Sequence, residues 1–156
     1  MLSDGRILTY KLGGNVELPT PEVTYLAVPT PPAMDYTAEQ QQHGQDLFHQ
    51  YCAVCHGPGV GTAGPVANLM YAEQDTHSIW DAIVVGGAYA DKGMPSFSHA
   101  LDAADAQDIR AYVIERAKTV IAFCESSFRE EYPELLDTAC EVPQVGDAGA
   151  IAGGGQ

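Results

Sequence analysis

A Cys-x-x-Cys-His motif, formed by Cys52, Cys55 and His56, constrains this chain more than any other feature. This spacing is the attachment signature of c-type haem. Two thiols three positions apart lie on one side of a helical turn, from which they can add to the two vinyl groups of a porphyrin. The imidazole that follows can then bind the iron from the proximal face. The motif therefore predicts one covalent haem c attached through Cys52 and Cys55, with His56 as an iron ligand.

Two other readings of the motif are open, a thiol redox site and half of a zinc site. A zinc ribbon needs a second close cysteine pair, and Cys124 and Cys140 are too far apart to supply one. A thioredoxin-like site needs a βαβ frame, which no pattern around the motif indicates. Both alternatives are weaker than haem attachment.

Met94 is the expected second iron ligand. It lies between Gly93 and Pro95, in a loop between two expected helices. A thioether on such a shaped loop can be held over the distal face of the iron, and His/Met ligation raises the reduction potential. His99, five residues further on, is the main rival. Met34 and Met70 are expected to fill the core.

Helical patterning dominates the middle of the chain, so we expect an all-α fold. Thr37 and Gln40 have the form of a capping box and predict a helix start. The apolar face of that helix is formed by Gly44, Leu47, Phe48 and Tyr51. A second helix is expected over 76–85. A third is expected from residue 102 or 103 to about 124, with Leu101, Ile109, Tyr112, Val113 and Ala117 facing inward.

The chain divides into four expected zones. Residues 1–35 are rich in proline and predict an extended arm, with a short strand over 6–12. Residues 36–123 hold the core domain. Residues 124–142 form an acidic extension, and residues 143–156 are mostly Gly and Ala and predict a flexible tail.

The charge composition limits the kinds of partner that the chain can bind. Acidic residues outnumber basic ones 21 to 7, which gives a formal net charge of −14. Nucleic acid and anionic membrane surfaces are therefore not expected as main partners. The N-terminus lacks a basic stretch followed by an apolar run, so no signal peptide is expected, and no apolar run could span a bilayer. Because lysines are few, a docking partner should be basic or apolar at its contact site.

The chain resembles class I c-type cytochromes over about residues 38–118. The residues that carry the resemblance are Gly44, Phe48, the motif from Cys52 to Gly57, Gly64-Pro65, Asn68-Leu69, Trp80, Gly93-Met94-Pro95 and Tyr112. The resemblance implies a class I cytochrome c fold, with three main helices around one haem. It also implies that Gly44 and Phe48 meet the last helix near Tyr112, and that the Pro65 carbonyl accepts the second N–H of His56.

Two aromatic residues have open roles. The resemblance suggests that the Trp80 N–H donates to a haem propionate, and a core aromatic is an equally weighted alternative. Tyr89 is a second candidate for propionate contact. His43 and His49 fall on the polar side of the first helix, and His77 is expected at the surface.

A narrower resemblance covers residues 5–14 and the proline-rich stretch after them. This segment is similar to the join in quinohaemoprotein alcohol dehydrogenases, where a domain holding pyrroloquinoline quinone (PQQ) is fused to a C-terminal cytochrome c domain. It implies that the upstream electron donor is a PQQ-dependent dehydrogenase, fused or separate, and that the chain is a piece of such a fusion.

Covalent haem attachment implies an oxidising, periplasmic or otherwise extracytoplasmic compartment, where disulfides persist. We therefore expect a Cys124–Cys140 disulfide that pins the acidic extension to the last helix and contributes roughly 3 kcal/mol. Two buried free thiols are the alternative.

These features predict an electron carrier domain, not an enzyme, that cycles between Fe(II) and Fe(III) and serves redox protein partners. The alternative is a haem enzyme, or a gas or peroxide sensor, with a labile Met94. No distal acid–base set supports peroxidase chemistry. A third alternative is a structural tether.

Overall fold

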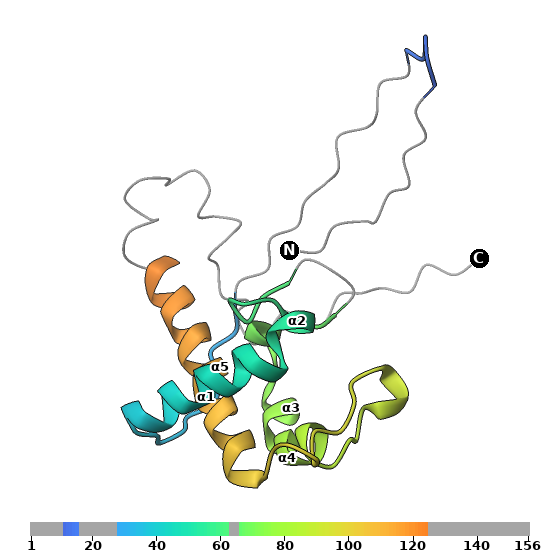
Figure 1. Cartoon of the computed structure of the whole chain (residues 1–156). Helices are drawn as coiled ribbons and strands as arrows, with labels where there is room; N and C mark the ends of the chain where they lie inside the picture. Colours follow the sequence, from blue (N-terminus) through green and yellow to red (C-terminus); the bar gives the residue numbers. More distant parts are fainter. Residues whose placement is uncertain (1–10, 16–27, 63–65, 125–156) are drawn as a thin grey trace, which may run out of the picture.

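The computed structural model describes residues 11–15, 28–62 and 66–124 and is helical wherever these residues form regular structure (Figure 1). Two long helices cross, and short helices and turns connect them. The elements are α1 (Ala38–Tyr51), α2 (Ala53–His56), η1 (Leu69–Tyr71), α3 (Gln74–Ser78), α4 (Trp80–Val84), η2 (Ala90–Lys92) and α5 (Ala103–Phe123). The expected all-α class is thus confirmed for this part of the chain.

Both long helices begin where the sequence predicts, and both have capping boxes, although only the α1 box was predicted. At α1 the Gln40 N–H donates to the Thr37 hydroxyl over 3.2 Å, and the Thr37 N–H donates to the Gln40 side chain over 3.0 Å. At α5 Asp102 and Asp105 exchange the same two bonds, at 2.9 and 3.1 Å. Each box satisfies two backbone N–H groups that the first helical turn leaves without partners.

The crossing of α1 and α5 depends on a glycine. A Cβ atom on Gly44 would lie 1.8 Å from the Asp108 carbonyl oxygen, so only glycine lets the two backbones approach this closely. One turn further along, the rings of Phe48 and Tyr112 pack with centroids 5.3 Å apart. Both side chains are buried. The expectation that Gly44 and Phe48 meet the last helix near Tyr112 is confirmed.

The prediction of a single helix over 76–85 is wrong in extent. The segment instead forms α3 and α4, separated by Ile79, which leaves the helical region with φ −111° and ψ 22°. The break lets Trp80 turn inward and donate to the Ala106 carbonyl over 2.9 Å. Because β-branched and aromatic residues have modest helix propensity, such a tertiary contact can outweigh it.

Several expectations lie outside the described residues. Of the strand expected over 6–12, only Lys11 and Leu12 are described, and they are not in a strand. Cys140, the acidic extension after Cys124 and the Gly/Ala tail are not described, so the disulfide and the zone boundaries stay predictions. None of the helices in the described ranges is long and apolar enough to cross a membrane.

Candidate haem site

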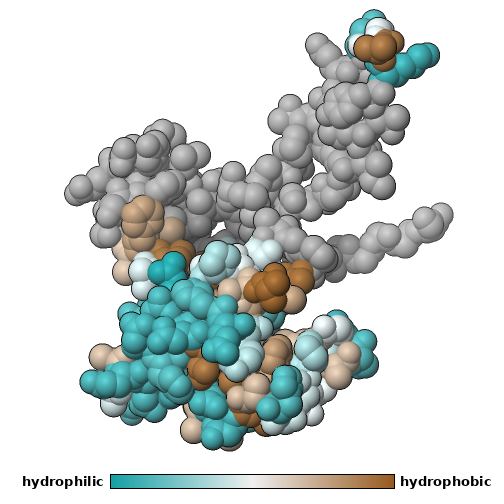
Figure 2. Space-filling model, viewed as in Figure 1, coloured by the Kyte–Doolittle hydropathy of each residue, from teal (hydrophilic) through white to brown (hydrophobic). Residues whose placement is uncertain are grey.

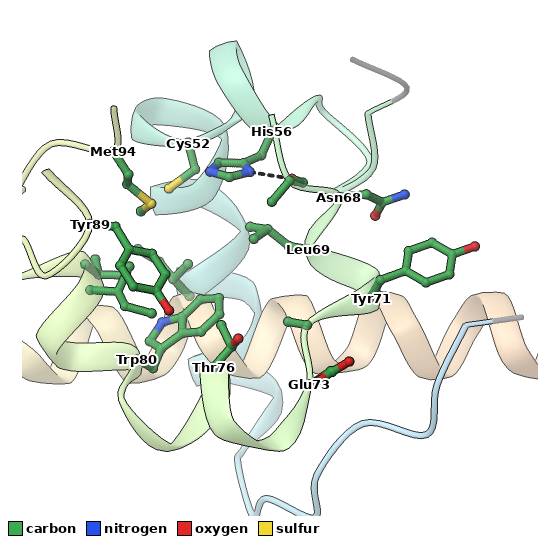
Figure 3. Close-up of a pocket in the computed structure, with 15 residues that line it drawn as sticks. Cys52, His56, Asn68, Leu69, Tyr71, Glu73, Thr76, Trp80, Tyr89 and Met94 are labelled. Carbon is green, nitrogen blue, oxygen red and sulfur yellow. Dashed lines mark hydrogen bonds between the residues drawn. The ribbon is translucent and has the colours of Figure 1, made fainter. Parts of the chain in front are cut away.

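A cavity of about 310 Å³ lies between the end of α1, the middle of α5 and the chain from Ala67 to Met94 (Figure 3). Its walls are mostly apolar. The residues that line it are Cys52, His56, Ala67, Asn68, Leu69, Tyr71, Ala72, Glu73, Thr76, Trp80, Ile83, Val84, Tyr89, Met94 and Ile109. The cavity thus brings together three of the sequence-predicted haem-binding residues, Cys52, His56 and Met94.

The junction of α1 and α2 presents the two cysteines. Cys52 caps α1 and is buried against the cavity, whereas Cys55 lies on α2 and is exposed. Burial, with a smaller contribution from Cys55, raises the pKa of the Cys52 thiol to about 11. Reactive cysteines in thiol redox motifs have lowered pKa values. The environment of Cys52 therefore disfavours a thiol–disulfide exchange site.

A hydrogen bond orients the imidazole of His56. Its Nδ1 donates to the Ala67 carbonyl over 2.8 Å, which leaves Nε2 unprotonated and able to bind a metal. Figure 3 shows the other ring nitrogen on the side of Cys52 and Met94. We expected the Pro65 carbonyl to accept this bond. Pro65 lies outside the described residues, and in the structure Ala67 accepts instead.

The loop after His56 explains why Ala67 takes this position. The Leu69 N–H donates to the Val60 carbonyl over 3.1 Å, and this bond folds the chain back over the imidazole. Gly57 begins the turn with φ +76°, and a Cβ atom there would lie 2.3 Å from the Gly61 carbonyl oxygen. Val60 is fully buried despite φ +71°, a conformation that valine rarely adopts.

Met94 enters the cavity from the loop after η2. Gly93 adopts φ +94°, and the Met94 N–H donates to the Tyr89 carbonyl over 3.1 Å. These two features direct the half-buried Met94 side chain to the cavity, where Figure 3 shows its sulfur beside His56 and Cys52. His99, the rival ligand, is exposed and does not line the cavity.

Trp80 and Tyr89 both line the cavity, in different ways. The Trp80 N–H donates to the Ala106 carbonyl, so this donor is already used within the protein. The core-aromatic alternative agrees with this geometry, and the propionate contact suggested for Trp80 does not. Tyr89 contacts the cavity with its ring, over which the Lys92 ammonium lies 4.1 Å from the centroid.

His77 is a residue whose position the sequence analysis missed. It was expected at the surface, but only 3% of it is exposed. Its ring stacks on Trp80 with centroids 5.4 Å apart and an angle of 11°. The Arg110 side chain donates to its Nδ1 over 3.4 Å. Burial and the positive charge of Arg110 lower the pKa of His77 to about 4. The i, i+3 spacing from Trp80 is the one sequence signal for this pairing.

The donor set fits a covalent haem better than a zinc ion. Within residues 11–15, 28–62 and 66–124, no group of three His, Cys, Asp or Glu side chains could hold a metal. An imidazole with its Nδ1 already bonded, a thioether and a buried thiol instead share one apolar cavity. This combination suits an iron porphyrin, whose own ring nitrogens supply the remaining ligands.

Comparisons with known proteins agree with this geometry. Residues 39–113 match the family described as cytochrome c oxidase, cbb3-type, subunit III. The chain is 33% identical over 117 residues to quinohemoprotein alcohol dehydrogenase ADH IIB of Pseudomonas putida, covering 74% of this chain and 17% of that protein. It is 30% identical over 78 residues to cytochrome c6 of Synechocystis, covering 49% of this chain and 65% of that protein.

A solved structure gives the same result. The structure of quinohemoprotein alcohol dehydrogenase ADHIIG from Pseudomonas putida HK5 matches with a TM-score of 0.58 and 30% identity, over 70% of this chain and 16% of that one. The fold and the matches together define a cytochrome c domain. It resembles the cytochrome c region of quinohemoprotein alcohol dehydrogenases. Domains of this family carry covalent haem c and are typically electron carriers, usually outside the cytoplasm.

Proposed function

We propose that the chain transfers single electrons through one haem, which Cys52 and Cys55 would hold by thioether bonds and whose iron His56 and Met94 would bind. One observation carries the proposal: His56, with its Nδ1 bonded to Ala67, and Met94 line the same apolar cavity as Cys52. The bound haem supplies the one-electron Fe(II)/Fe(III) couple.

The chain's own residues tune and protect that couple. The Ala67 carbonyl fixes the orientation of the His56 ring and increases its basicity as a ligand. The Gly93 turn directs Met94 to the cavity, where its thioether would serve as the second iron ligand. Trp80, Val84 and Ile109 keep water away from one wall of the cavity. Ligand identity, hydrogen bonding to the ligands and burial all help to set a haem potential.

The proposed donor is a PQQ-dependent dehydrogenase, in the same polypeptide or separate, and the electron passes on to a downstream redox protein. The relatives named quinohemoprotein alcohol dehydrogenases support a dehydrogenase of this kind as the donor. The chain spans only 15 to 17% of the length of the quinohemoprotein alcohol dehydrogenases that it matches. We place the protein in the periplasm or another extracytoplasmic compartment, where a Cys124–Cys140 disulfide would persist.

Absorption spectra of the haem-loaded chain, oxidised and reduced, test the ligand assignment. We expect sharp low-spin c-type bands, a far-red sulfur–iron band in the oxidised form, and no effect of carbon monoxide. Met94→Ala should remove the far-red band, admit carbon monoxide and lower the potential by on the order of 100 mV, within the ~0.8 V range that axial ligands control.

His99→Ala is the matched control, because His99 is the rival ligand in the same loop and is exposed. It should leave the spectrum and the potential unchanged. A Met94→Ala variant with an unchanged potential would contradict the assignment. A high-spin unmodified protein that binds carbon monoxide would support the alternative, a haem enzyme or a gas or peroxide sensor.

A further inference from the structure

The loop that carries Met94 is hydrogen-bonded directly to the end of α4. The Ser96 hydroxyl donates to the Val85 carbonyl over 2.5 Å. The Phe97 N–H donates to the Val84 carbonyl over 2.9 Å. Because the last carbonyls of a helix have no partner within it, these two bonds satisfy groups that the end of α4 would otherwise leave unpaired. The loop and α4 are therefore joined at two adjacent residues, just after the proposed iron ligand.

The close approach of the loop to α4 depends on a glycine. A Cβ atom on Gly87 would lie 2.9 Å from the Ser96 Cβ atom, so a side chain at position 87 would crowd Ser96. Gly87 also adopts φ +71°, a conformation that favours glycine. The backbone after α4 thus leaves room for the Ser96 side chain and for its bond to Val85.

The Ser96 hydroxyl also closes the next turn of the loop. Its oxygen accepts the Ser98 N–H over 3.2 Å, while its proton is donated to Val85. The N–H of Phe97 would be present with almost any residue at position 97, whereas the bond from position 96 requires a side-chain hydroxyl. Ser96 is thus a contact between loop and helix that the residue type itself determines.

Much of the loop is exposed to solvent. Residues 90–93, 95 and 98–100 are exposed. In Figure 2 the surface at this place, at the lower right, mixes hydrophilic and hydrophobic residues. Phe97 packs against the core, and its ring lies 6.2 Å from that of Tyr51. A segment held by few buried contacts opens readily, so each of its bonds to α4 matters.

We propose that Ser96 is a positioning residue that governs how readily Met94 leaves the haem iron. This inference rests on the proposed function and adds a residue that acts through its distal ligand. Only Pro95 separates Met94 from Ser96, and the proline ring fixes one of its backbone dihedral angles. A displacement of Ser96 is therefore transmitted to Met94 through a short, stiff stretch of chain. The bond to Val85 keeps the thioether at the iron and outside ligands away from it.

Replacement of the Met94 thioether by imidazole provides the test. In the oxidised, haem-loaded chain the iron–sulfur bond breaks, an iron–nitrogen bond to imidazole forms, and the iron keeps its oxidation state. Loss of the far-red band follows this exchange, and its rate at saturating imidazole reports the release of Met94. Ser96→Ala should raise that rate about tenfold, equivalent to about 1.4 kcal/mol and near the upper end for one neutral hydrogen bond.

Ser78→Ala is the matched control. Ser78 is exposed, and its hydroxyl donates to the Asp75 carbonyl over 2.6 Å within α3. The substitution therefore removes the same type of bond outside the Met94 loop, and it should leave the imidazole rate unchanged. Amide hydrogen exchange gives a second readout without added ligand. Ser96→Ala should speed exchange of the Phe97 amide, and Ser78→Ala should not.

The outcomes separate the role of Ser96 from that of Met94. An imidazole rate that Ser96→Ala leaves unchanged, or that Ser78→Ala raises equally, would overturn the role of Ser96. An unmodified oxidised chain without the far-red band would instead contradict Met94 as the ligand, and with it the proposed function. The two failures are therefore distinguishable.

Discussion

The α1–α5 crossing and the segment from Gly57 to Leu101 are built in different ways. The crossing consists of two helices with capping boxes at their starts, and Gly44 and Phe48 pack directly on α5. The described residues of the Gly57–Leu101 segment form only short helices and turns. It is held by single long-range bonds, such as those from Leu69 to Val60 and from Phe97 to Val84.

The same segment supplies most of the cavity lining, including Met94. The two regions therefore have different roles within a small domain. A rigid helix pair holds Cys52, and α2, which follows it directly, carries His56. A less regular wall, which a bound haem would complete, supplies Met94. Regions held by few buried contacts open more readily than packed helices. Substitutions in the two regions should therefore lower the free energy of unfolding by different amounts.

Gly44→Ala should have the largest effect on stability. The added Cβ would lie 1.8 Å from the Asp108 backbone oxygen, so α1 and α5 must separate. We expect a loss of about 3 kcal/mol in the free energy of unfolding, the upper end of the usual overpacking range. Urea unfolding followed by circular dichroism measures it.

Gly59→Ala is the control from the other region. A Cβ atom at Gly59 would meet nothing within 4 Å, so its cost should stay within about 0.5 kcal/mol. Equal costs for the two alanine variants would show that the close helix crossing is not the rigid part of the domain.

His77→Phe should change how stability depends on pH. The pKa of His77 is about 4 in the folded chain, against the ordinary 6.5 of a histidine, so the unfolded chain binds more protons between these pH values. Stability therefore falls as pH drops from 6.5 to 4, by at most about 1.4 kcal/mol per pH unit for one proton. Phenylalanine keeps a ring against Trp80 and removes this dependence, which urea unfolding at several pH values would reveal.

In the helix pair, His43 should make stability depend on pH in the opposite direction to His77. Its hydrogen bond to Asp108, 2.9 Å long, raises its pKa above the ordinary value. Its contribution is present below pH 6.5 and disappears as pH rises through the folded pKa. Because His43 is exposed, His43→Gln should cost less than about 0.5 kcal/mol at low pH. If His77→Phe leaves the slope unchanged while His43→Gln alters it, the assignment of the buried histidine is wrong.

The helix caps should give smaller effects than Gly44→Ala. Thr37→Ala and Asp102→Ala each remove a side-chain acceptor at a helix start and should cost about 1 kcal/mol in urea unfolding. Asp91→Ala, at an exposed site in η2, makes the same charge change as Asp102→Ala without removing a cap. Asp91→Ala should change the free energy of unfolding by no more than about 0.5 kcal/mol. If Asp91→Ala lost as much stability as Asp102→Ala, the effect would be due to charge and not to capping.

The all-α fold and the starts of α1 and α5 could be predicted because their signals are local. Thr37 and Gln40, or Asp102 and Asp105, interact across three residues, so sequence spacing alone brings them together. The haem motif is equally local, because the spacing of Cys52, Cys55 and His56 alone identifies it, although in the structure Cys52 is buried and Cys55 is exposed. These are the features that the amino-acid sequence determined by itself.

Other features depended on partners far away in the chain, and only the tertiary structure decided them. The acceptor of the His56 N–H is Ala67 and not Pro65, because the loop folds back onto Val60. The expected middle helix is divided at Ile79, Trp80 donates to Ala106 on α5, and the buried His77 stacks on Trp80. A hydrogen-bond donor takes whichever acceptor the packed backbone brings within about 3 Å, and no spacing rule identifies an acceptor 26 residues away.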